Sequence, residues 1–365
     1  MDSIIIDTHA DSPLRLLEGI DLGKESQDGH LDYVRMQKGK VDAIFFALFT
    51  ANSMESDSST LQAFRLLEAV YQSLEQNSNN VKLACSPEDI LINKANKKQS
   101  VLIGMENGSP IRADPSLLKI FHRLGVRYIT LTHQQNNELC DSSTDGERRW
   151  KGLSQEGKKM VHEMNQLGIM IDLSHASDDT CREVLTLSTL PVIASHSCCR
   201  AICDIPRNMP DDIIKAIGQQ GGVVQVCFSP AFLDISYWKK ILPLRQLRDE
   251  YRQKYKHTPD IYSPLLENIY QQIRDVPAPS LEAVVDHIDH IVSVAGIDHV
   301  GLGSDFDGIQ ALPAGMKNIA DIPRLISLLK KRGYPQQAID KITGRNFIRV
   351  FQANNAQSHS IIYKF

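Results

Sequence analysis

Eight short runs of β-branched and aromatic residues recur along this chain, and segments of helical periodicity or high charge separate them. In order, the runs are IIID, VDAIFFALF, VLIGME, VRYITLTH, IMIDLSH, VIASHS, GGVVQVCF and HVGLGSDF. In the separating segments, apolar residues recur at three- and four-residue spacing, as in TLQAFRLLEAVYQSLEQ. A strand followed by a helix, repeated eight times, is typical of a parallel (β/α)8 barrel, or TIM barrel. We therefore predict an α/β chain that forms one such barrel over residues 1–365.

A doubly wound α/β sheet is the alternative fold, but no glycine-rich phosphate loop follows any of the runs. The segment from about 236 to 275 is long for a connection between a strand and a helix, and it is rich in Tyr, Lys, Arg and Glu. We predict a helical insertion there. Its role stays open between a lid over the barrel mouth, which we favour, a dimer contact and a solvated helical segment.

Composition argues against several kinds of partner. The formal net charge is −4 and no basic block occurs, so we expect no nucleic acid and no anionic membrane surface as partner. No run approaches the ~20 apolar residues of a membrane span, and the first apparent strand begins too close to Met1 for a signal peptide. The seven cysteines lie mostly in strand-like or helix-like surroundings. We therefore expect reduced thiols and a cytoplasmic location.

Ionisable side chains gather where the strand-like runs end. They are His9 and Asp11 after the first run, Glu106 at the end of the third, His133 of the fourth, His175 of the fifth, His196 of the sixth and Asp305 of the eighth. The strand ends of a closed barrel converge on one mouth, so these seven groups can reach a common centre. Such a concentration of buried charge is costly unless a metal cluster offsets the desolvation.

The spacing of these residues indicates metal ligation. Residues two apart on extended backbone point the same way, so His9 and Asp11 can hold one ion. Asp7 shares that parity and stays open as a ligand, although its earlier position suggests a supporting role. The 21 residues from His175 to His196 span one helix and one strand, which places both on neighbouring strand ends. Nitrogen and carboxylate ligands suit zinc best, with manganese and iron as alternatives.

Taken together, the motifs resemble the membrane dipeptidase (renal dipeptidase) family of the amidohydrolase superfamily. IDTHADSP, LIGMENG, LTHQQNN, GLSQEGKKMVHEMNQLGIMIDLSH, SHSCCRAICDIPRNMPDD and HVGLGSDFDG occur in the family's order, from about Ile4 to Phe351. The resemblance implies a TIM barrel of the metal-dependent hydrolase type. It also implies zinc-dependent hydrolysis of dipeptides, with those that carry a C-terminal D-residue among the expected substrates.

The resemblance assigns a metal ligand to each of five positions. It implies that His9 and Asp11 bind one zinc ion and that His175 and His196 bind a second. Glu106 and a hydroxide would bridge the two ions, giving two zinc ions per chain. A bridging hydroxide with its pKa near 7 is a strong nucleophile at neutral pH.

Three further roles follow from the resemblance. His133 would hold the substrate carbonyl as it becomes an oxyanion, Arg207 would bind the terminal carboxylate of the dipeptide, and Asp305 would carry a proton to the leaving amine. Each has a structural alternative: His133 could cap a strand, and Arg207 could pair on the surface with Asp211 or Asp212. Asp307 is the alternative to Asp305 as the catalytic carboxylate.

The chain departs from the family pattern beside the expected substrate. QQNNELCDSS follows LTH where many members carry a CNTPW-like stretch, and Phe232 replaces a tyrosine of the mammalian members. The dipeptide preference therefore stays open. Two other functions also stay open: a different amidohydrolase reaction, on an N-acyl amino acid or a lactone, and a non-catalytic barrel that binds a metal or a peptide. A homodimer is a further open expectation.

Overall fold

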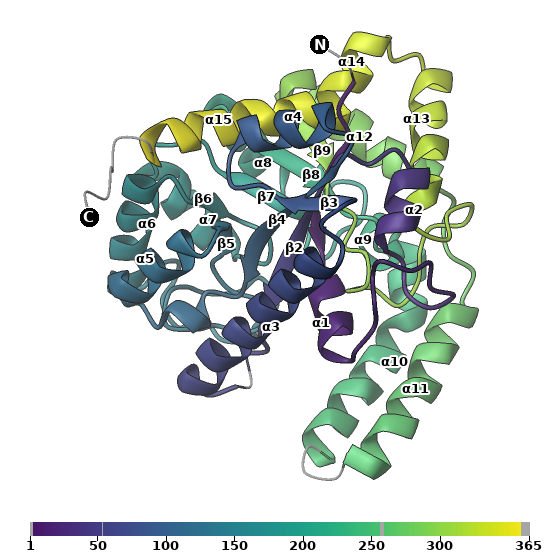
Figure 1. Ribbon diagram of the computed structural model, residues 1–365. Helices are drawn as coiled ribbons and strands as arrows, with labels where there is room; N and C mark the ends of the chain where they lie inside the picture. The colour runs from purple at the N-terminus through teal and green to yellow at the C-terminus, as the bar shows by residue number, and fades with distance from the viewer. Residues whose placement is uncertain (1–2, 53, 256–258, 359–365) are drawn as a thin grey trace.

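The parallel sheet of this protein curls into a nearly closed barrel, as the sequence predicts. The computed structural model describes residues 3–52, 54–255 and 259–358 (Figure 1). The strands run in the order β1-β2-β4-β5-β6-β7-β8-β9 and all of their pairings are parallel. They are β1 (Ile6–Ala10), β2 (Ala43–Phe49), β3 (Val81–Leu83), β4 (Gln99–Glu106), β5 (Val126–Thr130), β6 (Met170–Asp172), β7 (Ile193–Ser197), β8 (Val223–Val226) and β9 (Val300–Leu302).

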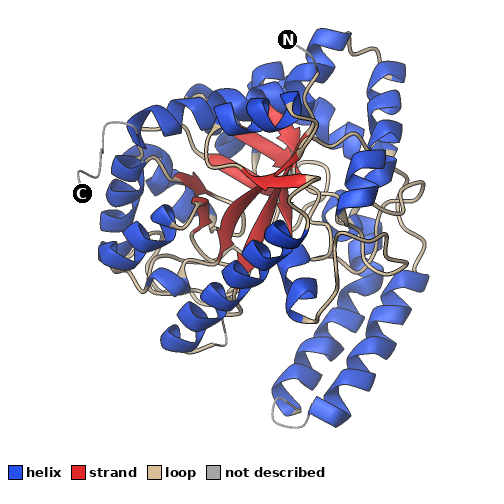
Figure 2. Ribbon diagram, viewed as in Figure 1, coloured by secondary structure: helices blue, strands red, loops and turns tan. Residues whose placement is uncertain are grey.

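Helices surround the strands and cover the outside of the barrel (Figure 2). They are α1 (Ser12–Leu17), α2 (Tyr33–Lys38), α3 (Ser56–Gln76), α4 (Pro87–Ala95), α5 (Pro115–Arg123), α6 (Gln155–Leu167), α7 (Asp178–Leu187), α8 (Asp211–Gln219), α9 (Pro230–Leu233), α10 (Ile235–Lys254), α11 (Pro259–Asp275), α12 (Glu282–Ala295), α13 (Ile322–Lys331), α14 (Gln336–Asp340) and α15 (Asn346–Ser358). Single helical turns are η1 (Ser109–Ile111), η2 (Ile297–His299), η3 (Ile319–Asp321) and η4 (Lys341–Arg345). Local signals set these bounds: the Ser154 hydroxyl accepts the Gly157 N–H at the start of α6, and Gly168, at φ 71°, ends it.

Strand β3 is one element that the sequence pattern missed. It pairs with Gln99–Val101 at the start of β4, whereas β5 pairs with β4 from Ile103 onward. Strand β2 occupies the other edge of β4. Three residues, of which Lys82 is exposed, are too few to show an alternating pattern, so the run VKL carries no readable strand signal.

The loop after β9 closes the barrel against β1. The Thr8 hydroxyl donates a hydrogen bond to the Leu302 carbonyl at 3.1 Å. The N–H of Asp11 donates to the Phe306 carbonyl at 2.8 Å, and the N–H of Asp305 donates to the His9 carbonyl at 3.1 Å. This closure brings polar residues from the first and last strands of the barrel together.

A hydrophobic cluster fills the barrel below its polar end. It contains apolar residues from seven of the paired strands, as expected for the packed interior of a barrel, and Phe347 and Phe351 of α15 pack on it. The Asn346 side chain, which begins α15, donates to the carbonyl of Val300, the first residue of β9. Helix α15 therefore covers the N-terminal end of the strands and leaves the C-terminal end for the site.

Two long helices lie side by side where the insertion is predicted. Helices α10 and α11, in green in Figure 1, extend together away from the barrel. Residues 256–258, between them, fall outside the described residues. Whether this pair covers the barrel mouth, and whether the chain is a single domain, stay predictions. No helix in the described part of the chain has the length and hydropathy needed to cross a bilayer, and all seven cysteines are free thiols.

His287 on α12 is expected to make the protein less stable in mild acid. Its ring is fully buried; Nδ1 accepts from the Cys199 N–H at 3.0 Å and Nε2 donates to the Leu233 carbonyl at 3.1 Å. Burial lowers the pKa of His287 to about 4. The neutral ring is therefore favoured in the folded state. Its stabilisation is complete above the unfolded pKa of about 6.5 and is lost as the pH falls toward 4, by about 3 kcal/mol in total.

Urea unfolding between pH 7 and pH 4 measures this contribution. The variant His287→Gln is expected to show a shallower loss of unfolding free energy over that interval. The matched control is His162→Gln, because His162 is exposed on α6 and hydrogen-bonds only Gln166 among the described contacts. Equal slopes for the wild type and His287→Gln would show that another group causes the acid sensitivity.

Candidate active site

The structure brings seven of the predicted residues together at the C-terminal ends of the strands. His9 lies in β1, Asp11 directly after it, Glu106 ends β4 and His196 lies in β7, while His133, His175 and Asp305 lie three residues beyond the ends of β5, β6 and β9. Six of the seven are buried, and His133 is partly exposed. The prediction that strand ends gather these groups around one centre therefore agrees with the geometry.

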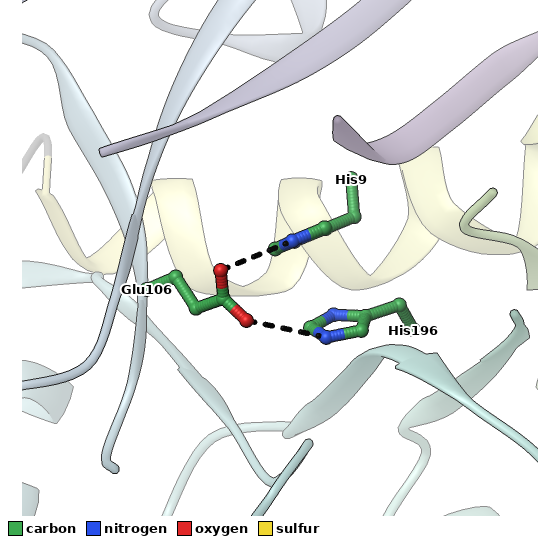
Figure 3. Close-up of side chains that lie close together, drawn as sticks. All are labelled: His9, Glu106 and His196. Atoms are coloured by element: carbon green, nitrogen blue, oxygen red, sulfur yellow. Dashed lines mark ion pairs between the residues drawn. The ribbon is translucent and has the colours of Figure 1, made fainter. Parts of the chain in front are cut away.

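Glu106 lies at the middle of this cluster. Its Oε2 atom is 3.6 Å from His9 Nε2, whereas its Oε1 atom is 3.1 Å from His175 Nε2 and 3.5 Å from His196 Nε2. Figure 3 shows the carboxylate between the rings of His9 and His196, with one oxygen facing each. The two oxygens thus face two separate sets of nitrogens.

His9 and Asp11 approach each other, but not through a continuous strand. His9 Nε2 lies 3.8 Å from Asp11 Oδ2. Strand β1 ends at Ala10, its pairing with β2 shifts register between Asp7 and Ala10, and Asp11 begins α1 with φ −89° and ψ 17°. The strand thus ends before Asp11, but the side chains of His9 and Asp11 still face each other, as the sequence predicts.

Asp7 supports the backbone in this structure. Its Oδ1 atom accepts hydrogen bonds from the Ser304 N–H at 2.8 Å and the His9 N–H at 3.3 Å. Burial raises the pKa of Asp7 to about 6. Among the described residues it does not join the groups whose ligand atoms converge. Asp7 therefore ties the loop after β9 to β1.

The donor set of the cluster fits metal ions. Ligand atoms lie within 4.8 Å of one another in three overlapping groups of described residues: His9, Glu106 and His196; Glu106, His133 and His175; and His9, Asp11 and Asp305. His9 Nε2 and Asp11 Oδ1 are buried without a hydrogen-bond partner. His175 Nε2 and His196 Nε2 are only 2.9 Å apart, which requires a proton or a cation between them. Buried nitrogen and carboxylate donors left in this state are what a metal site needs.

Burial dominates the electrostatics of the cluster. It raises the pKa of Glu106, Asp11 and Asp305, and the carboxylate of Glu106 adds to this rise for the other two. Burial lowers the pKa of His133 to about 3, with a further contribution from the Arg207 guanidinium. The pKa of His175 and that of His196 also fall well below the ordinary value. Neutral imidazoles beside closely packed carboxyl groups would be balanced by bound cations.

Three residues of the site have left-handed backbone conformations although they are not glycine. The φ angles are 68° at His175, 66° at Asp305 and 79° at Asn107, which follows Glu106. Such conformations cost on the order of 1 kcal/mol or more each and persist only where the surroundings hold them. The N–H of Ser143 donates to the His175 carbonyl at 2.8 Å and provides one such restraint. Backbone strain of this kind at residues that carry or adjoin candidate ligands is typical of a functional site.

The structure separates the two candidate catalytic carboxylates. Asp305 belongs to one of the converging groups with His9, and its Oδ2 accepts from the Cys227 thiol at 3.6 Å. Asp307 instead accepts from the Ser12 hydroxyl at 2.5 Å and the N–H of His30 at 2.5 Å. Both oxygens of Asp307 are thus used to hold the loop against neighbouring segments, which leaves Asp305 as the carboxylate at the centre.

Arg207 is buried beside the cluster without an acidic partner in the described structure. Its Nη2 donates to the His196 carbonyl at 2.7 Å, whereas its Nε is buried and has no hydrogen-bond partner. The Phe232 ring lies 5.2 Å from its guanidinium carbon. An unpaired buried guanidinium is suited to an incoming anion, because its fork can hold a carboxylate with two hydrogen bonds.

The surface ion pairs that were the alternative for Arg207 do not form. Asp212 pairs with Arg182 at 2.9 Å, and Asp211 pairs with His290 at 2.8 Å. His133 does not cap a strand either, since β5 ends three residues earlier, at Thr130. Its Nε2 lies 3.8 Å from Glu106 Oε1 and its ring centre lies 4.4 Å from that of His175. His133 therefore belongs to the cluster, and Arg207 lies beside it.

Sequence reasoning missed the residues that hydrogen-bond the Nδ1 atoms of two of the histidines. The hydroxyl of Tyr128 lies 2.8 Å from His9 Nδ1, and the hydroxyl of Ser195 lies 2.8 Å from His196 Nδ1. Asp172, the last residue of β6, accepts from Ser195 in turn. A fully buried acid within the apolar run IMIDLSH was the signal that could have revealed this second layer.

The chain resembles proteins of one family over nearly its whole length. The sequence model of that family, described as membrane dipeptidase (peptidase family M19), matches residues 1–362. The chain is 33% identical to the uncharacterized dipeptidase C3A11.10c of Schizosaccharomyces pombe, over 98% of this chain and 82% of the relative. It is 30% identical to dipeptidase verJ of Clonostachys rogersoniana, over 96% of this chain and 84% of the relative. The crystal structure of the probable dipeptidase PvdM from Pseudomonas aeruginosa has a TM-score of 0.84 at 27% identity, with 97% of this chain and 96% of that chain covered.

Proposed function

The chain belongs to the membrane dipeptidase family, peptidase family M19, and we propose from this premise that it hydrolyses dipeptides with two zinc ions. The family and the donor set together make it a metal-dependent peptide-bond hydrolase. Histidine nitrogens and carboxylate oxygens without a thiolate favour zinc as the metal. The observation that carries the proposal is Glu106, whose two oxygens face different sets of histidines.

These distances support two positions for the ions. His9 and Asp11, with Oε2 of Glu106, would hold one ion. His175 and His196, with Oε1 of the same carboxylate, would hold the other. Bound at these positions, the metal pair would supply Lewis acidity for the substrate carbonyl and for the attacking water.

The remaining side chains supply the proton transfers and the orientation. Asp305 would accept a proton from the attacking water at Oδ1, since Oδ2 accepts from the thiol of Cys227, and would return it to the leaving amine. His133 is neutral because burial lowers its pKa to about 3, so one ring N–H is available to donate to the developing oxyanion. Together, these roles account for both halves of peptide hydrolysis without a further acid or base.

Arg207 would bind the terminal carboxylate of the dipeptide. A carboxylate held at this guanidinium sets the distance between the chain end and the scissile bond, which favours dipeptides over longer peptides. The unpaired Nε and the absence of an acidic partner among the described residues support this role. Phe232, stacked near the guanidinium, adds cation–π contact but no hydrogen bond.

Arg207→Lys is expected to reduce kcat/KM for dipeptides by about 10-fold to 100-fold, mainly through a higher KM. An ammonium group keeps the charge but loses the fork that holds two oxygens. Steady-state kinetics measures the effect. The matched control is Arg200→Lys, because Arg200 forms a two-oxygen ion pair with Asp178 at 2.6 and 2.8 Å in the same loop region. If both variants keep the wild-type KM, Arg207 does not bind the substrate carboxylate.

A small substrate panel tests the proposed function. Purified, zinc-loaded protein is assayed with L-Ala-L-Ala, L-Ala-D-Ala, N-acetyl-L-alanine and a simple lactone, and bound metal is counted by elemental analysis. We expect hydrolysis of both dipeptides and two zinc ions per chain. Turnover of N-acetyl-L-alanine alone would favour the other amidohydrolase reaction, for which the altered QQNNELCDSS loop leaves room. Metal binding without any turnover would indicate a non-catalytic barrel.

The D-residue is the finer part of this proposal. Activity on L-Ala-L-Ala without activity on L-Ala-D-Ala would remove it and leave the dipeptidase activity intact. A cytoplasmic location and a homodimer stay predictions. Cell fractionation tests the first, and light scattering of the purified protein tests the second.

A further inference from the structure

A buried hydrogen-bond chain lies behind His196, on the side away from Glu106. The Ser195 hydroxyl lies 2.8 Å from His196 Nδ1 and 2.6 Å from Asp172 Oδ2. Asp172 and Ser195 are fully buried, and His196 is 1% exposed. The hydrogen bonds therefore lead from Asp172 through Ser195 to Nδ1 of His196. The other ring nitrogen of His196, Nε2, faces Glu106.

The hydrogen bonds of Asp172 decide where the protons of this chain lie. Its Oδ1 accepts the backbone N–H groups of Ser174 at 3.0 Å and Ser195 at 2.7 Å. Its Oδ2 accepts the hydroxyl groups of Thr130 at 2.5 Å and Ser195 at 2.6 Å. These four donors match the accepting capacity of an ionised carboxylate. The single hydroxyl proton of Ser195 is thus directed at Asp172.

The tautomer of His196 follows from that direction. A hydroxyl group has one proton, so the Ser195 oxygen can only accept from His196 Nδ1. His196 then carries its proton on Nδ1 and a lone pair on Nε2, 3.5 Å from Glu106 Oε1. A metal ligand must present a lone pair, and a partner on the second ring nitrogen is the usual means of securing it.

Tyr128 extends the same arrangement toward His9. The Tyr128 hydroxyl lies 2.8 Å from His9 Nδ1. When the phenol oxygen accepts from His9 Nδ1–H, His9 Nε2 is left with a lone pair. A buried hydroxyl group therefore contacts Nδ1 of both histidines, Tyr128 at His9 and Ser195 at His196.

We propose that Asp172 is a positioning residue which, through the hydroxyl of Ser195, fixes His196 as the Nδ1–H tautomer and presents Nε2 as a metal ligand. This inference rests on the proposed metal centre. It assigns a role in metal affinity to a residue that would otherwise count as a buried strand acid. Asp172 touches neither substrate nor metal in this assignment and acts only through Ser195.

Asp172→Asn is expected to reverse the direction of the hydrogen bonds from residue 172 to His196 while the new side chain keeps the shape of the old one. The two backbone N–H groups require an acceptor, so the amide oxygen of the new side chain takes the place of Oδ1 and its NH₂ group takes the place of Oδ2. That NH₂ donates to the Ser195 oxygen, whose own proton must then turn to His196 Nδ1. The remaining ring proton moves to Nε2 and points at Glu106, where it blocks ligation.

The test is the zinc affinity of purified protein, measured by competition with a chromophoric chelator after metal removal. Asp172→Asn is expected to weaken one of the two zinc equivalents by about 10-fold to 100-fold. The matched control is Thr130→Val, which removes a hydrogen bond to the same oxygen of Asp172 but has no link to a histidine. It is expected to lower the melting temperature while zinc affinity stays within about threefold of the wild type.

A second variant covers a folding failure of Asp172→Asn. Ser195→Ala removes the hydroxyl between the carboxylate and the ring, and it is also expected to weaken one zinc equivalent. The proposal is overturned if each of the two variants that folds binds zinc as tightly as Thr130→Val does. It is also overturned if neither variant folds while Thr130→Val does, because Asp172 and Ser195 would then act in folding alone. A wild-type protein that binds no zinc would instead contradict the metal centre itself, so the two failures are distinguishable.

Discussion

Replacing Asp305 with Asn is expected to lower kcat for dipeptide hydrolysis by about 100-fold to 10,000-fold while the bound zinc stays unchanged. An amide of the same shape keeps a polar contact with the Cys227 thiol, which lies 3.6 Å from Oδ2 in the wild type. It cannot take up a proton from water at neutral pH, however, and cannot return one to the leaving amine. Without that return the amine leaves as an anion, which is the costly step. Steady-state kinetics with elemental analysis of the same sample measures both quantities.

Asp307→Asn is the matched control for this experiment. It changes a buried acid two residues away whose oxygens accept from the Ser12 hydroxyl and the His30 N–H. We expect it to lower the free energy of unfolding, because the amide can accept at only one end, with a much smaller effect on kcat. Unchanged turnover of Asp305→Asn would remove Asp305 from the mechanism. A loss of one zinc ion in Asp305→Asn would instead show that Asp305 is a ligand of the ion held by His9 and Asp11. The ligand atoms of these three residues do lie close together.

The barrel and the position of its site could be predicted because both depend on short-range patterns. The eight runs carry β-branched or other apolar residues by which they are recognised as strands, and parallel strands of one barrel must end at the same face. Glu106 and His196 could therefore be placed together although they lie 90 positions apart in the sequence. The charged residues stood out because each interrupts or ends an apolar run.

The second layer of the site depends on distances that no spacing encodes. Tyr128 in β5 reaches His9 in β1 although β2 and β4 lie between these strands in the sheet order, and Ser195 in β7 reaches Asp172 in the neighbouring β6. A hydroxyl group gives no sign in the sequence of which partner its proton faces. The turn at Asp11 was missed for a similar reason, since HAD reads equally well as a strand or as the start of a helix. Period-two patterns describe regular strands and do not show at which residue a strand ends.

Glu106→Gln is expected to remove both zinc ions and with them nearly all hydrolysis. Glu106 is the residue whose two oxygens face the histidines of both proposed ion positions, at 3.6 Å for His9 and at 3.1 Å for His175. An amide presents one oxygen and one NH₂ group, so one position gains a donor where it needs a ligand. Loss of the bridging charge also leaves two cations close together without a shared counter-ion. Elemental analysis and dipeptide turnover measure the two effects.

Thermal unfolding gives this variant a signature of its own. Burial raises the pKa of Glu106, which means that the ionised carboxylate lowers the stability of the metal-free wild type. Glutamine lacks this cost, so metal-free Glu106→Gln should melt at least as high as the metal-free wild type. Zinc at about a thousandfold excess over Kd should stabilise the wild type by about 4 kcal/mol per site and the variant hardly at all.

Asp7→Asn is the control that makes the result specific to the bridge. Asp7 is a buried acid in β1, two residues before His9, and burial also raises its pKa, but its Oδ1 atom accepts from backbone N–H groups. We expect this variant to keep both zinc ions and a zinc-dependent rise in melting temperature. If Asp7→Asn loses an ion while Glu106→Gln keeps two, the bridge lies elsewhere and the assignment of the five ligands must be rebuilt around Asp7. If Glu106→Gln loses a single ion, Glu106 is a ligand at one position only, and the two ions do not share it.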